Sequence, residues 1–88
     1  MAIYILADRI HLSKDSVVYR IKFGDPNNTE PAQDVVIPLG PDGKCRSEAE
    51  ITTTTGDTLS WMSHSMLGKL LWEQEKREDW PEHTGKQS

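Results

Sequence analysis

Apolar and polar side chains alternate along much of the first half of the chain, a pattern typical of β-strands with one buried face. The clearest case is the segment 17–23, in which the residues of one face are Val17, Tyr19, Ile21 and Phe23. A short apolar run at 2–7 and alternating segments at 34–39 and 45–55 favour three more strands. The loop 24–33, rich in Pro, Gly and Asn, separates the strands into two hairpins.

A helical period replaces the alternation after Gly56 and continues to about Asp79, before Pro81 stops it. Asp57 or Thr58 can cap its first turn. The helix face that we expect to cover the sheet carries Leu59, Met62, Met66, Leu67 and Leu70. The sequence therefore predicts an α+β fold: a four-stranded antiparallel sheet (two hairpins) followed by one long C-terminal helix packed on one face.

These elements fill residues 1–82 as a single β-β-β-β-α domain. The remaining residues, 83–88, are polar, and we expect them to form a disordered tail. The strand and helix periods also predict a core. Its members should be buried together because they lie on facing surfaces: Tyr19, Ile21, Phe23, Val35, Ile37, Ile51, Met66 and Leu70.

Charge and composition narrow the class of protein. The formal net charge of −4 argues against binding to duplex nucleic acid, which normally requires a basic stripe. The N-terminal apolar run meets Asp8 and Arg9 too early for a signal peptide. No segment approaches the roughly 18 apolar residues of a membrane helix. We therefore expect a cytoplasmic protein that does not contact a membrane.

Candidate chemistry is sparse. The chain has three histidines, none in a metal-ligand spacing such as HExxH: His11, His64 and His83. A single cysteine, Cys45, excludes an internal disulfide or a cysteine-rich zinc site. Its basic neighbours Lys44 and Arg46 should point to the opposite face of a strand, so they would not activate its thiol. We therefore expect no metal, no cofactor and no catalytic centre.

A second helix face lies opposite the apolar one and carries two tryptophans about three turns apart, Trp61 and Trp72. The small residues Ser65 and Gly68 lie between them and leave a shallow notch into which another element can pack. Tryptophan is enriched at the hot spots of protein interfaces. The alternative is that a loop or the tail of the same chain covers both rings.

Acidic residues late in the helix, Glu75 and Asp79 among them, form either a solvated surface or half of an electrostatic interface for a protein partner with a basic surface. We therefore expect a non-enzymatic protein–protein interaction module, such as a small regulator, inhibitor or assembly factor. Its interface would be formed by Trp61, Ser65, Gly68, Trp72, Glu75 and Asp79. A homodimer is the simplest version, because one self-complementary patch suffices.

Two other functions use different residues. A small enzyme or ligand binder with a site formed between subunits would draw on His11, Tyr19 and His64. A binder of single-stranded nucleic acid would use the sheet, through Tyr4, Arg20 and Lys22. The negative net charge opposes the second of these.

Overall fold

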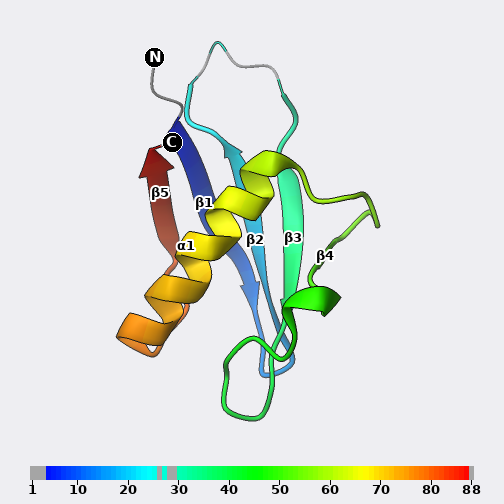
Figure 1. Ribbon diagram of the computed structural model, residues 1–88, viewed down its shortest axis with the longest axis vertical. Coiled ribbons are helices and arrows are strands. Elements are labelled where there is room, and N and C mark those ends of the chain that lie inside the picture. The colour runs from blue at the N-terminus through cyan, green and yellow to red at the C-terminus, as the bar shows by residue number, and fades with distance from the viewer. Residues whose placement is uncertain (1–3, 26, 28–29, 88) are drawn as a thin grey trace.

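Five antiparallel strands and one long helix form two layers (Figure 1). The computed structural model describes residues 4–25, 27 and 30–87. The strands lie in the order β4-β3-β2-β1-β5, so β1 is an interior strand between β2 and β5. The elements are β1 (Tyr4–Leu12), β2 (Ser16–Phe23), β3 (Gln33–Pro38), the 3₁₀ helix η1 (Glu48–Glu50), β4 (Thr52–Thr53), α1 (Trp61–Arg77) and β5 (His83–Gln87).

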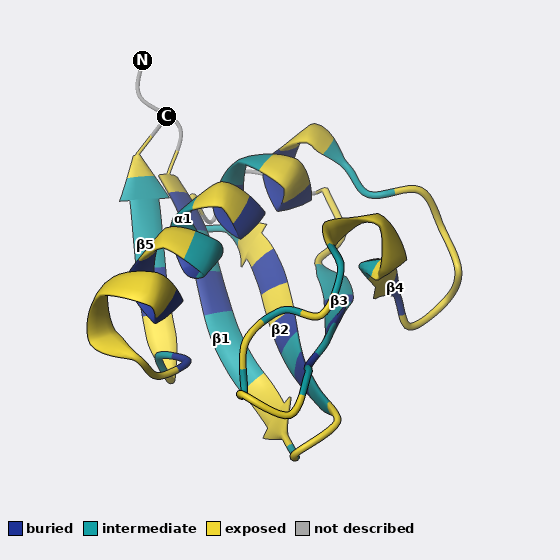
Figure 2. Ribbon diagram, turned by 60° about the horizontal axis from the view of Figure 1, so that its bottom comes forward, coloured by how far each residue is buried: buried dark blue, intermediate teal, exposed yellow. Residues whose placement is uncertain are grey.

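The α+β class, the antiparallel sheet and the C-terminal helix are confirmed. The buried residues lie along the strands beneath α1 and in the helix itself (Figure 2). Six of the eight residues predicted for the core are buried there, while Phe23 and Ile51 pack against the core from its margin. The helix contributes the face that its period predicted, through Met62, Met66, Leu67 and Leu70.

The predicted bounds of the helix are corrected at both ends. Ser60 is the N-cap, in place of Asp57 or Thr58, and its hydroxyl accepts a hydrogen bond from the Ser63 backbone N–H. Residues 57–58 instead continue the turn after β4, where Asp57 accepts a hydrogen bond from Thr55. The helix ends at Arg77, because Glu78 adopts a left-handed conformation with φ of 60°.

The segment 45–55 is not one continuous strand, as the alternation predicted. Only Thr52–Thr53 pairs with β3, and Cys45 forms an isolated bridge with Leu39. Between them the backbone turns into η1, and Glu50 of η1 forms an ion pair at 2.9 Å with Arg46, which precedes this helix. This turn brings Ile51 against the core, so η1 and its flanks cover the β3 side of the sheet.

The sheet has a fifth strand at residues 83–87, so the prediction of a disordered tail is wrong for these residues. These residues form β5, which pairs with β1 from Asp8↔His83 to Tyr4↔Gln87. Side chains from α1 and β5 join the two layers: Thr84 donates to Glu73 at 3.2 Å, and Lys86 to the Ser65 carbonyl at 3.3 Å. Residue 88 of that predicted tail lies outside the described residues.

Candidate functional site

The two tryptophans of the outer helix face are half exposed. Trp61 retains 49% of its surface and Trp72 retains 58%. The Trp61 ring packs against Phe23, with ring centroids 5.6 Å apart. The Lys76 ammonium lies over the Trp72 ring, 5.8 Å from its centroid. Within the described part of the chain, neither ring is enclosed. The loop 24–33 is one segment that could cover them in the alternative interpretation, and its residues 26 and 28–29 lie outside the described part.

Gly68 lies exposed between the two tryptophans. A Cβ placed on it would meet no atom within 4 Å. Ser65 is partly buried, and its carbonyl accepts the hydrogen bond from Lys86. The notch predicted between the tryptophans is therefore open at Gly68 and supported from below by β5 at Ser65.

An apolar crevice of about 320 Å³ begins at Gly68 and runs toward η1. Its walls come from α1 and from the segment before it, and include Ile51, Leu59, Leu67 and Leu71. His64 lies at its mouth, on the exposed side of the helix. The sequence did not predict this crevice, since its second wall depends on the turn at η1.

The two acidic residues of the predicted interface, Glu75 and Asp79, lie in different parts of the structure. Glu75 is exposed on the last turns of α1, on the same side as Trp72. Asp79 is exposed beyond the end of the helix, because the left-handed residue Glu78 redirects the chain there. It lines a separate groove of about 730 Å³, formed with the β1–β2 turn and the loop that follows β3.

The three residues considered for a catalytic or ligand site do not meet within the chain. His11 lies exposed near the end of β1, whereas His64 is on the outer side of α1. Tyr19 is fully buried, and its hydroxyl donates to the Pro81 carbonyl at 2.6 Å. Burial also raises the pKa of the Tyr19 phenol well above its ordinary value, so it is neutral at physiological pH.

The face of the sheet away from α1 carries paired charges. Arg20 makes two hydrogen bonds to Asp34, at 2.9 and 3.1 Å, and these raise the pKa of its guanidinium. Asp8 lies 2.5 Å from a His83 ring nitrogen and 3.8 Å from the Lys22 ammonium. The two cations considered for single-stranded nucleic acid are therefore already engaged by carboxylates.

Metal and thiol chemistry have little support in the described ranges. No group of three or more His, Cys, Asp or Glu side chains there is arranged to hold a metal ion. Cys45 is partly buried, and this burial raises the pKa of its thiol, which keeps it in the protonated, weakly nucleophilic form.

Among the residues that the structure describes, no helix is both long and apolar enough to cross a membrane.

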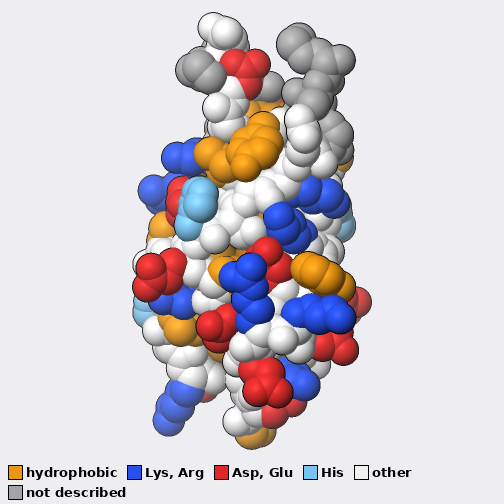
Figure 3. Space-filling view, turned by 90° about the vertical axis from the view of Figure 1, so that its left-hand side faces the viewer, with side chains coloured by type: hydrophobic (Ala, Val, Ile, Leu, Met, Phe, Trp, Pro, Cys, Tyr) orange, Lys and Arg blue, Asp and Glu red, His pale blue; other side chains and the backbone are white. Residues whose placement is uncertain are grey.

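Figure 3 shows the side of the molecule that carries β5, where acidic and basic side chains are mixed and hydrophobic ones form small separate patches.

A comparison of the chain with protein-family models, curated proteins and solved structures found no similar protein. The candidate site thus rests on its own geometry: two half-exposed tryptophans, an open glycine between them and an apolar crevice beside it.

Proposed function

We propose that this protein is a non-catalytic interaction module that binds a second protein chain through the outer face of α1. The observation that carries this proposal is the open glycine, Gly68, between the half-exposed rings of Trp61 and Trp72. Exposed tryptophan is uncommon, and it dominates the binding energy of many interfaces. A side of a helix with two such anchors, and only a serine and a glycine between them, suits the close approach of another chain.

Gly68 is costly for the fold. A glycine in a helix interior destabilises a protein by about 0.5–1 kcal/mol relative to alanine. Because a Cβ would meet nothing within 4 Å, the packing within the described chain does not require a glycine here. Gly68 thus lowers stability without a role in the packing of its own chain. This supports a role in binding, in which the glycine leaves room for the backbone or a side chain of a partner.

The spacing of the face favours a second copy of the same chain as the partner. Trp61, Ser65, Gly68 and Trp72 follow one another at intervals of four, three and four residues, the a/d spacing of a coiled-coil seam. The midpoint between the tryptophans coincides with the midpoint between Ser65 and Gly68. Two antiparallel copies of α1 about a two-fold axis would therefore place each Trp61 beside the partner's Trp72, and each Ser65 beside the partner's Gly68.

The decisive experiment separates association from folding. We expect Gly68→Ala to raise the thermal midpoint of the isolated chain, because alanine is the better helix former and has free space. The same change, and more strongly Gly68→Leu, should weaken self-association measured by sedimentation equilibrium. Trp72→Ala should weaken it by about 2 kcal/mol, as expected for an interface anchor.

Ile10→Ala is the matched control, since Ile10 is also a half-exposed apolar residue but lies in β1. It should leave self-association unchanged. A wild-type chain that stays monomeric at millimolar concentration contradicts the second-copy version of the proposal. If Gly68→Leu and Trp72→Ala both associate like the wild type, the outer face of α1 is not an interface.

A further inference from the structure

We infer that the groove beyond the C-terminal end of α1 is a second binding site, which takes a short partner segment with an aliphatic side chain next to a Lys or Arg. The groove has a volume of about 730 Å³ and shares no residue with the seam of Trp61, Ser65, Gly68 and Trp72. Three parts of the chain form it: the β1–β2 turn, the loop after β3 and the segment 78–82.

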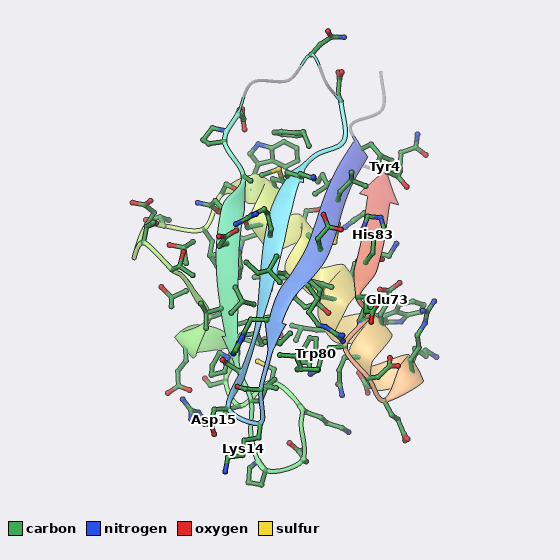
Figure 4. The ribbon with its side chains drawn as sticks, turned by 180° about the vertical axis from the view of Figure 1, so that it is seen from behind. Tyr4, Lys14, Asp15, Glu73, Trp80 and His83 are labelled. Carbon is green, nitrogen blue, oxygen red and sulfur yellow. The ribbon has the colours of Figure 1, made fainter. Side chains whose placement is uncertain are left out.

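The floor of this groove is fixed before any ligand arrives. Trp80 is buried, and its indole N–H donates to the Gly43 carbonyl at 2.8 Å. Arg9 donates to the Trp80 carbonyl at 2.6 Å, and the Tyr19 hydroxyl donates to the next carbonyl, that of Pro81. Figure 4 shows Trp80 toward the same end of the sheet as Lys14. A preformed floor lowers the ordering cost of binding.

The groove offers apolar surface for one side chain of the ligand. Leu12 lies on its rim and leaves 47% of its surface exposed, although it is a leucine in a β-strand. Pro41 and Pro81 supply rigid apolar surface beside it, and Leu39 lies deeper, in the core. Concave apolar surface of this kind is what ligand sites in proteins usually present.

The rim of the groove carries Glu78 and Asp79 on one side and Lys14 on the other. Its acidic side selects a basic ligand. Glu78 and Asp79 are both exposed, and no side-chain hydrogen bond or ion pair engages their carboxylates among the residues that the structure describes. Arg9, in contrast, is already held by the Trp80 carbonyl and by Glu82 at 3.5 Å. Two unengaged carboxylates beside apolar surface complement an aliphatic residue adjacent to a cation.

The position of these carboxylates costs the fold stability. Glu78 has a φ of 60°, a left-handed conformation in which glycine or asparagine is favoured. Both acids also lie at the negative end of the helix dipole, where cations are stabilising, as Lys76 and Arg77 are. Local choices that oppose the fold are expected at functional positions, so this arrangement agrees with a binding role.

The test uses the hexapeptide Gly-Leu-Arg-Leu-Arg-Gly, with Gly-Leu-Glu-Leu-Glu-Gly as the acidic control, added to ¹⁵N-labelled protein. We expect the basic peptide to shift the backbone signals of Leu12 and Gly43 and the indole N–H signal of Trp80. The acidic peptide should shift none of them. No shift at these positions at millimolar peptide, or equal shifts with both peptides, overturns the inference.

Variants of matched charge then test the rim. Glu78→Gln with Asp79→Asn should weaken binding of the basic peptide about fivefold, the effect of losing two exposed ion pairs. Glu50→Gln with Asp57→Asn removes the same charge at two exposed residues outside the groove and should leave the affinity unchanged. Lys14→Glu, on the opposite rim, should strengthen binding. If the two double variants behave alike, only the net charge of the protein attracts the peptide and the groove is not its site.

The peptide experiment tests the groove separately from the proposed interface on the outer face of α1. Peptide shifts centred on the Trp72 indole, with Trp80 unchanged, would overturn the groove and leave the outer face of α1 as the interface. Loss of self-association in the Gly68→Leu variant, with the peptide affinity retained, would show that the two surfaces act separately.

Discussion

At the scale of single residues, Tyr19 joins the core of the sheet to the segment after the helix. Its ring is fully buried and lies 6.4 Å from that of Trp80, while its hydroxyl donates to the Pro81 carbonyl. Burial is the main cause that raises the pKa of its phenol, and the Arg9 charge opposes the rise only in part. Ionising this group therefore costs more free energy in the folded chain than in the unfolded one.

This difference predicts a fall in stability at alkaline pH. The unfolded chain begins to lose its tyrosine protons near pH 10, whereas folded Tyr19 keeps its proton. The free energy that favours folding should thus be complete below about pH 10. Above that pH it should decline by about 1.4 kcal/mol per pH unit. Urea unfolding at a series of pH values measures the slope, and the Tyr19→Phe variant should lose it.

The Tyr19→Phe variant should also lose stability at neutral pH, so its alkaline behaviour is compared with its own stability at neutral pH. Removing the hydroxyl leaves the Pro81 carbonyl without this donor, so Tyr19→Phe should cost about 1 kcal/mol at neutral pH. Tyr4, which is exposed, supplies the control: Tyr4→Phe should retain the alkaline decline. A wild-type protein as stable at pH 11 as at pH 8 would contradict the role given to Tyr19.

At the scale of elements, β5 is the least expected part of the fold, and both layers hold it. Its backbone pairs with β1, and Thr84 reaches the buried carboxylate of Glu73. Lys69 of α1 lies 4.0 Å from the same carboxylate and donates to the Gly85 carbonyl. A lysine over the edge of a sheet also hinders further strand pairing, which natural edge strands commonly avoid in this way.

We predict that β5 is needed for stability. A chain that ends after Glu82 should lose about 2–4 kcal/mol of folding free energy, because five cross-strand pairs and the hydrogen bond of Thr84 disappear. Urea denaturation followed by circular dichroism gives this value. An unchanged midpoint would mean that residues 83–87 behave as the disordered tail that the sequence predicted.

The contrast between β2 and β5 explains how far the sequence predicts the elements. In β2 the apolar residues themselves alternate, so the strand, its buried face and most of the core follow from the sequence alone. The residues of β5, HTGKQ, contain no such alternation. Their strand exists because β1 offers free backbone groups and α1 offers Glu73, and neither is visible in the local sequence.

The candidate site divides in a similar way. A helical period suffices to place Trp61, Gly68 and Trp72 on the exposed side of α1. The crevice beside Gly68 and the groove beside Asp79 could not be predicted, since their walls come from segments far apart in the chain. The one local signal for the groove was the acidic residue pair at the end of the helix, where the helix dipole favours cations.

At the scale of the whole molecule, α1 and η1 together cover one face of the sheet. The helix packs against β1, β2 and β5, while η1 packs against β3 (Figure 1). The two central strands, β1 and β2, therefore have a paired neighbour on each side and the helix above them. β4, in contrast, has two residues and one neighbour.

This arrangement predicts a gradient of hydrogen exchange across the sheet. The amides of β2 should exchange most slowly, near the rate set by global unfolding, because their bonds open only when the sheet comes apart. The amides of β4 should exchange within the first minutes. Deuterium exchange followed by nuclear magnetic resonance measures both. Equal protection in β2 and β4 would contradict the layered arrangement.

The position of β1 has a consequence for the order of events during synthesis. One of its neighbours, β2, follows it closely in the chain, but the other, β5, is translated only after α1. A nascent chain therefore carries β1 with one bare edge, which includes the apolar residues Ile5 and Leu6, until the last strand arrives. Unpaired apolar edges are the surfaces through which incomplete chains aggregate. Slower translation of the segment between α1 and β5 would lengthen that exposure without altering a single residue of the finished protein.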